Sequence, residues 1–316
     1  MGEFILRRLL AAIPVLLIVT LIAASIMQLV PGDPAAVIAG QGASDAEVAQ
    51  VRAQLGLDRS FVVRLGEWYV GLARGDLGHS LMLNRSVGQA ILERVPVTLA
   101  LSGVALLLTV LIGVPAGVLA ALRPNSWVDQ LVLTLALIGV SVPNFWLSLM
   151  LIVLFGVIVD WLPTGGYVPF TEDPVEWARS LVLPSISLAL LQIGLLARIT
   201  RATMLEVLRN DYVRTARAKG LPRRMVVAKH ALKNVMIPVV TVIGISFGLL
   251  LSGSVVIETV YSIPGMGRLL ATAIFSRDYP VIQGGLLVTA ATLVLLNLVV
   301  DLLYAALDPR VTYDRR

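Results

Sequence analysis

The sequence predicts an all-α membrane protein with six transmembrane helices, and three observations support this fold class. The 316 residues are 57% hydrophobic and only 14% charged, whereas soluble domains carry about 25% charged residues. The mean hydropathy is +0.87. Six apolar segments reach the length of about 20 residues that a bilayer requires. Cysteine is absent, which excludes disulfides.

The first predicted span follows two arginines, as a cleaved secretory signal would. Its apolar run is longer than the core of a signal peptide, and five more spans follow, so we interpret it as a retained span. The six spans are expected at Leu9–Val30, Pro96–Leu122, Leu131–Val159, Leu181–Ala197, Val235–Ile257 and Val281–Leu307.

Lysine and arginine are concentrated in one loop, at 198–234, which contains all three lysines of the chain. The loops on the opposite side are balanced or acidic. The positive-inside rule therefore predicts a cytoplasmic basic loop and two cytoplasmic termini. The expected organisation is a first span with the N-terminus (1–30), an external loop (31–95), a five-helix core (96–307) and a cytoplasmic tail (308–316).

The long external loop is expected to contain two short helices. Ser44–Leu57 starts with a capping box, because Ser44 precedes Glu47 by three residues, and Gly56 is suited to end the helix. Phe61–Gly75 has amphipathic spacing. These helices serve either as a packing cap on the bundle or as a docking surface for a partner that delivers substrate, and the sequence leaves both open.

A short, isolated helix is predicted in the basic loop. Asn210 or Asp211 is suited to its start, Gly220 to its left-handed end, and Pro222 prevents continuation. The helix is expected at Tyr212–Lys219, with three small side chains that let another surface approach and three long cations at the edges: Thr215, Ala216 and Ala218, and Arg214, Arg217 and Lys219. It is either a knob that fits a partner or a loop that contacts only anionic lipid. Nucleic acid is disfavoured, since Tyr212 is the one aromatic residue of the run.

Motifs along nearly the whole chain resemble the peptide-transporter permeases of bacterial ABC importers. The basic loop reads YVRTARAKGL and then HALKNVMIPVVTVIG. The other matching motifs are LVPGDP (Leu29–Pro34), GDLGHS (Gly75–Ser80), SVPNFW (Ser141–Trp146), LPTGG (Leu162–Gly166), ETVYSIPGMGRL (Glu258–Leu269), RDYPVIQG (Arg277–Gly284) and NLVVDLLYAALDPR (Asn297–Arg310). This resemblance implies the type I ABC-importer permease fold.

The resemblance also implies a role for the short helix. It identifies Tyr212–Leu221 as the coupling helix that sits in a groove of an ATPase subunit. The general motif of such permeases begins Glu-Ala-Ala, whereas Arg214 and Thr215 stand at its first two positions here; Ala216 and Gly220 match. The partners implied are a homologous second permease, two ATP-binding subunits, an external solute-binding protein and membrane lipid.

The chain has no G-x-x-x-x-G-K-[ST] loop. We therefore expect a transport subunit that is not an enzyme and carries no cofactor, with ATP and Mg bound by partner subunits. The alternative is a secondary transporter of peptides or metal chelates driven by an ion gradient. Two isolated histidines, His79 and His230, make a metal site improbable.

Several positions inside the spans are candidates for hinges, contacts or function. Pro115, Pro143 and Pro184 interrupt apolar runs. Gly113 with Gly117, and Gly244 with Gly248, permit close helix contact. Ser141 and Asn144 place polar groups beside Pro143, at a kink that we interpret as a candidate part of the pathway. Asn297, Asp301 and Tyr304 share one face of the last span, and Asp301 is either a hydrogen-bonded buried carboxylate or part of a proton-coupled carrier.

Overall fold

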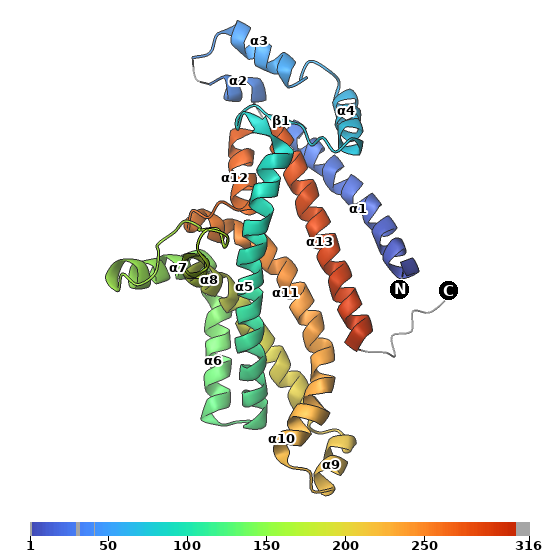
Figure 1. Cartoon of the computed structure of the whole chain (residues 1–316), viewed down its shortest axis with the longest axis vertical. Coiled ribbons are helices and arrows are strands. Elements are labelled where there is room, and N and C mark those ends of the chain that lie inside the picture. The colour runs from blue at the N-terminus through green and yellow to red at the C-terminus, as the bar shows by residue number, and fades with distance from the viewer. Residues whose placement is uncertain (1, 30–31, 41, 308–316) are drawn as a thin grey trace. The chain divides into compact units, whose positions relative to one another are not determined.

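The computed structural model describes residues 2–29, 32–40 and 42–307 and is almost entirely helical (Figure 1). The chain separates into two compact units. Unit 1 comprises Met1–Val97 and Pro264–Leu295, and unit 2 comprises Thr98–Ile263 and Leu296–Arg316. The predicted tail at 308–316 and the side chain of Tyr304 lie outside the described residues.

The connections between the elements are mostly short, and the one between η1 and α8 runs from Val159 to Asp173. The elements are α1 (Gly2–Leu29), α2 (Pro34–Ala39), α3 (Asp45–Gln54), α4 (Phe61–Ala73), β1 (His79–Ser80), β2 (Arg85–Ser86), α5 (Val87–Leu122), α6 (Trp127–Ser141), α7 (Asn144–Leu151), the π-helix η1 (Ile152–Ile158), α8 (Pro174–Val207), α9 (Asp211–Ala218), α10 (Arg223–Met225), the π-helix η2 (Val226–Ala231), α11 (Leu232–Val260), α12 (Met266–Ser276) and α13 (Tyr279–Leu307). The two strands form an antiparallel hairpin.

The predicted all-α membrane architecture is confirmed. Within the described ranges, five helices are long and apolar enough to cross a membrane, and a sixth crossing is present if α6 and the α7–η1 segment count as one broken span. This number matches the six spans that the sequence predicts.

The third span differs from the expected single run at Leu131–Val159. α6 and the α7–η1 segment meet at an angle of 103°. Pro143 has no N–H to continue the α6 ladder, and it restricts the residue before it to extended backbone, where Val142 has φ −83° and ψ 123°. The result is two helices, a larger change than the kink that the sequence predicts.

The fourth span is twice as long as the apolar run at Leu181–Ala197. α8 has 34 residues, because polar turns extend it at both ends. At its start the Asp173 carboxylate accepts the N–H groups of Val175 and Glu176, at 2.8 and 3.1 Å. Hydropathy alone misses such turns, since their side chains are polar.

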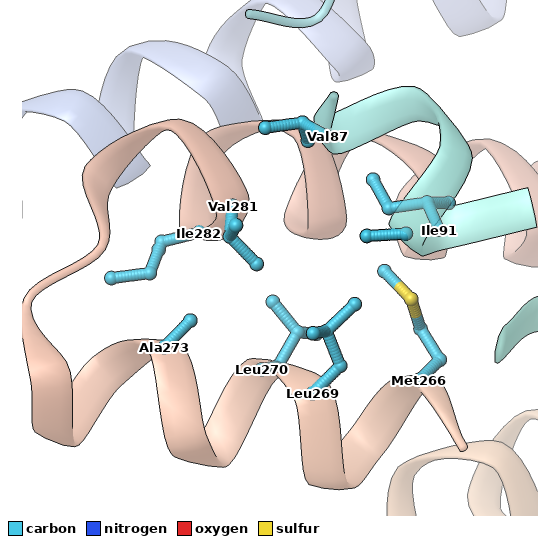
Figure 2. Packing of buried hydrophobic residues seen from close by; sticks show 9 residues of the cluster. Val87, Ile91, Met266, Leu269, Leu270, Ala273, Val281 and Ile282 are labelled. Carbon is cyan, nitrogen blue, oxygen red and sulfur yellow. The ribbon is translucent and has the colours of Figure 1, made fainter. Parts of the chain in front are cut away.

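The core of unit 1 is formed where three helices meet (Figure 2). Val87, Ala90 and Ile91 from the first turns of α5 pack with one face of α12 and with the start of α13. The α12 and α13 residues of this cluster are Met266, Leu269, Leu270, Ala273, Val281 and Ile282. A buried hydrogen bond from the Ser80 hydroxyl to the Asp278 carboxylate connects β1 to the turn between α12 and α13.

Close helix contacts in unit 2 depend on glycine. A Cβ at Gly113 would lie 3.2 Å from the carbonyl oxygen of Ile193, and one at Gly117 would lie 2.7 Å from the Cβ of Thr200, both on α8. A Cβ at Gly194 of α8 would lie 2.6 Å from the carbonyl oxygen of Ala136 in α6. The close approach predicted for the first glycine pair is therefore confirmed, and α8 is the central helix of this unit.

The helices expected in the loop before α5 are present. Ser44 and Glu47 form the predicted capping box at the start of α3. The Glu47 carboxylate accepts the Ser44 backbone N–H at 2.7 Å, and these bonds lower the pKa of Glu47. Gly56 has a φ of +63°, in the left-handed region that suits a helix end. α4 covers nearly all of the predicted second helix.

Candidate functional site

The short helix α9 has both of the boundaries that the sequence predicts, within one residue. It starts after Asn210, which is the N-cap by its backbone but makes no side-chain cap bond. At its end the N–H of Gly220 donates to the carbonyl of Arg217 at 2.9 Å, and the N–H of Leu221 donates to that of Ala216 at 3.4 Å. With a φ of +75° at Gly220, this is a Schellman closure. The carbonyls at the helix end are thereby satisfied without a partner chain.

One face of α9 packs against its own loop. Val213 is fully buried, Ala216 is 6% exposed and Val226 of η2 is 1% exposed, and the three form a small apolar cluster. Leu208 and Leu221 pack against this cluster. The structure thus places Ala216 on the inward face, where it anchors the helix, and not on the outer surface expected for the small residues.

α9 is also held to the long helices on either side. The Tyr212 hydroxyl accepts a hydrogen bond from the Asn234 amide of α11 at 2.7 Å. Leu208, which packs on the apolar cluster, is the C-cap of α8. In Figure 1, α9 and α10 stand together beyond the ends of α8 and α11. α9 is therefore attached to two long helices, α8 and α11.

The outer face of α9 is polar and cationic. Arg214, Thr215, Arg217, Ala218 and Lys219 are exposed. Arg214 lies 3.4 Å from Asp211 on the same helix, an exposed contact that contributes little. Within the described part of the chain, neither Arg217 nor Lys219 forms an ion pair. Two cations are thus presented to whatever meets this face.

A buried ion pair reinforces the same end of unit 2. Asp129 in the first turn of α6 is 2% exposed, and both of its carboxylate oxygens accept bonds from the Arg201 guanidinium of α8, with Nη2 to Oδ2 at 2.6 Å. The backbone N–H of Asn125 donates to the same carboxylate at 2.9 Å. The sequence places Arg201 only among the loop cations, because its partner is 72 positions away.

The α10 segment has a related contact. The Arg223 guanidinium donates to the carbonyl of Leu122 at 2.7 Å, at the last turn of α5. The carbonyls at a helix C-terminus have no intrahelical partner, and a cation is favoured there. α5 is therefore bonded to α10 and α6 to α8, while α9 itself contacts the end of α8 and α11.

The candidate pathway residues lie at the break in the third span. Ser141 and Pro143 are exposed and Asn144 is partly exposed. The Asn144 carbonyl accepts from the Ser148 hydroxyl at 2.8 Å, and the Ser148 carbonyl accepts from the Tyr261 hydroxyl at 3.3 Å. The buried Tyr261 follows α11 directly, so the break is linked to that helix.

The polar residues of the last span are placed differently from one another. Asn297 is exposed, whereas Asp301 is partly buried. A second acidic residue, which sequence reasoning missed, is fully buried: Glu258 near the end of α11 accepts the Thr98 hydroxyl of α5 at 2.6 Å. Its position one residue beyond the apolar run at Val235–Ile257 made it resemble a loop residue. In the described ranges, no group of three His, Asp or Glu residues is placed to hold a metal ion.

Comparison with known proteins identifies two matching family descriptions. The model described as "Binding-protein-dependent transport system inner membrane component" matches residues 113–313, and the one for the N-terminal part of such membrane components matches residues 1–102.

Similar proteins cover the same length. A putative peptide transport system permease protein of Brucella abortus is 50% identical, over 99% of this chain and all of the relative. A dipeptide transport system permease protein of Alkalihalophilus pseudofirmus and a glutathione transport system permease protein of Salmonella typhimurium are 43% and 44% identical, each over 99% of this chain and all of the relative. Among solved structures, an inward-facing MetNI methionine ABC transporter chain aligns with a TM-score of 0.57 and 21% identity, over 70% of this chain and 97% of that chain. This last likeness shows the fold.

Proposed function

Because the chain belongs to the family of inner membrane components of binding-protein-dependent transport systems, we propose that it is a permease subunit of an ATP-driven importer of peptides or a related small solute. Full-length relatives named for the transport of peptides, dipeptides and glutathione support this solute class. In the proposed assembly the chain forms half of the translocation pathway, and a homologous permease forms the other half.

The single observation that carries this proposal is the construction of α9. The helix is sealed at its C-terminus, anchored by Val213 and Ala216, and bonded to α11, yet it presents Arg217 and Lys219 outward. A rigid element of this kind transmits a push into the membrane helices, whereas an unanchored loop would absorb it. We assign it as the coupling helix that contacts an ATPase subunit.

The source of energy lies in partner chains under this proposal. The sequence contains no phosphate-binding G-x-x-x-x-G-K-[ST] loop, so two ATP-binding subunits would supply hydrolysis and hold ATP and Mg. The basic loop and both termini would face the cytoplasm by the positive-inside rule. The helices α2, α3 and α4 would then face outward, where a solute-binding protein delivers its cargo.

The break between α6 and α7 is the proposed pathway element of this chain. It combines exposed Ser141 with partly exposed Asn144 at a 103° bend, and irregular backbone at membrane depth is tolerated where it lines a cavity. Alanine at both positions should alter uptake at unchanged membrane abundance. Unchanged uptake would remove this segment from the pathway.

The coupling role is testable in the assembled transporter. The complex would be reconstituted in nanodiscs with its ATPase and binding protein, and ATP hydrolysis would be measured with and without loaded binding protein. Arg217→Glu reverses one charge on the outer face of α9, and loss of a charged contact of about 1.4 kcal/mol would lower stimulation roughly tenfold. Gly220→Pro removes an N–H that closes the helix and should act likewise.

The matched control is Arg123→Glu, the same charge change at an exposed position in the turn between α5 and α6. It should leave stimulation near the parent value. Equal stimulation in Arg217→Glu and the parent would remove the coupling role from α9. Solute transport by this chain alone in liposomes, without an ATPase, would instead support a carrier driven by an ion gradient.

A further inference from the structure

One side of α4 is apolar and exposed. Val62, Val63 and Val70 on this side are 76%, 48% and 53% exposed. Gly66 and Ala73 are exposed beside them, because at 100° per residue the five positions fall within about 100° of one another. We call these five residues the valine face. A contiguous apolar surface that remains exposed on a folded protein marks an interaction surface.

The charged residues of α4 lie away from the valine face. At the same angular spacing Arg64 is on the opposite side of the helix. Glu67 lies at the margin of the face and is paired with Arg59 at 2.5 Å. The valine face itself has no charged or hydrogen-bonding side chain. Surfaces that meet a soluble protein usually mix polar and apolar groups, whereas acyl chains require only apolar contact.

A side-chain contact places α4 beside a membrane span. The Tyr69 hydroxyl lies 2.7 Å from the Thr20 hydroxyl and donates to the Leu17 carbonyl at 3.3 Å. Both partners belong to the apolar stretch Ile5–Ser25 of α1, and Thr20 is five residues before its end. At 1.5 Å per residue the contact lies roughly 7 Å inside that stretch. α4 is therefore held at the level of the apolar part of α1 (Figure 1).

The start of α13 independently indicates the same level. Arg64 and Trp68 of α4 line one cavity together with Gln283, and all three belong to unit 1. Gln283 is the fifth residue of the apolar stretch Tyr279–Leu302. The side of α4 with Arg64 and Trp68 therefore faces the rest of unit 1, near the ends of two spans. The valine face is on the opposite side of the helix and points away from the unit at this level.

The length and the aromatic residues of α4 match a helix at a membrane surface. Its 13 residues are fewer than the roughly 20 that a span requires. Trp68 and Tyr69 are in edge-to-face contact, with ring centroids 5.3 Å apart. Tryptophan and tyrosine are enriched where a membrane meets water. Amphipathic helices at this boundary place their apolar face among the acyl chains and their polar face in water.

We propose that α4 is an interfacial helix whose valine face inserts among the acyl chains of the bilayer. The sequence left open a packing cap or a docking surface for the helices of this loop, and membrane anchoring is a third role. Arg52 of α3 binds Asp33, the N-cap of α2, at 2.5 Å. α4 thus anchors at the bilayer a loop whose other two helices are joined to each other. This role is independent of the solute and of any ATPase.

Cysteine labelling tests the proposal, because the chain has no cysteine of its own. Val70→Cys reports the valine face, and Ala49→Cys, at an exposed alanine of α3, is the matched control. Each full-length variant would be placed in phospholipid nanodiscs without any other protein and treated with a charged maleimide. The thiolate that reacts is disfavoured among acyl chains by about one pKa unit or more. Val70→Cys should therefore react about tenfold more slowly than Ala49→Cys.

A fluorophore on the same cysteines identifies what surrounds them. A nitroxide on the acyl chain of phosphatidylcholine should quench the fluorophore in Val70→Cys and not in Ala49→Cys. Val62→Cys, at the most exposed valine, repeats the measurement if Val70→Cys does not fold. Equal labelling rates without quenching would overturn the proposal, as would slow labelling without quenching, which would assign the face to a contact within the protein. Fast labelling that slowed only when a solute-binding protein was added would replace the anchor by a docking surface.

Discussion

Adding one methyl group at Gly117 should separate α5 from α8. A Cβ there would lie 2.7 Å from the Thr200 Cβ and 3.0 Å from the Arg201 backbone nitrogen, and closer still to the Ala197 carbonyl oxygen. Ordinary contact begins at 3.4 Å. The obstructing atoms belong to the backbone or are attached to it, so no side chain is able to rotate out of the way.

The expected size follows from two opposing terms. Overpacking of a tight contact costs about 1–3 kcal/mol, and a clash with backbone belongs near the upper end. Alanine in place of glycine in a helix contributes up to about 1 kcal/mol in the favourable direction. Gly117→Ala should therefore lower the free energy of unfolding by about 2 kcal/mol.

Gly103 supplies the matched control, because it lies on the same helix and a Cβ there would meet nothing within 4 Å. Gly103→Ala should be neutral or raise the free energy of unfolding by up to about 1 kcal/mol. Both variants would be unfolded with denaturant in detergent micelles and followed by circular dichroism. If Gly117→Ala were as stable as Gly103→Ala, the close approach of α5 and α8 would be refuted.

Three further outcomes are expected elsewhere. Asp129→Asn leaves the Arg201 guanidinium without its buried counter-charge and should cost about 3 kcal/mol of unfolding free energy; a change below about 0.5 kcal/mol in the same denaturation assay would contradict the buried pair. Ala216→Glu places a charge in the apolar cluster and should reduce ATPase coupling. Ala218→Glu, on the exposed face, should leave the fold intact. If a protease cut the basic loop at the same rate in both variants, the inward placement of Ala216 would be wrong. The bonds between the ionised Glu47 carboxylate and Ser44 lower the pKa of Glu47, so they stabilise α3 fully at pH values above the ordinary pKa of a carboxyl group. This stabilisation is lost as the pH falls through the lowered pKa. Amide protection in α3 should therefore drop under acid in the parent and not in a variant with alanine at this position.

Local signals in the sequence predicted the short helices well. Ser44 with Glu47, and Gly220 with Pro222, are separated by only a few residues, so the atoms that form each helix boundary are fixed by neighbouring positions. The break at Pro143 was located for the same reason, although its angle was not, because the direction of α7 is set by distant contacts such as that of Ser148 with Tyr261.

Properties that depend on distant partners were missed. Hydropathy cannot find the polar turns that extend α8, since they are stabilised by capping at Asp173 and not by lipid. Asp129 and Arg201 are 72 positions apart, and Thr98 and Glu258 are 160 apart, so nothing in the local pattern connects them. Ala216 looked like a contact residue because small size is compatible with either face of a helix, and only the position of Val226 decides between them.

The wide winding of η2 has a consequence for how this region tolerates changes in length. Val226, which anchors α9, is the first residue of that π-helix, and α11 begins directly after its last residue. A π-helix has i→i+5 hydrogen bonds, so deleting one residue from the six would leave the i→i+4 bonds of an ordinary α-helix and keep Val226 on its face. Adding a residue offers no such regular ladder, so this segment should accept the loss of one residue more readily than the gain of one.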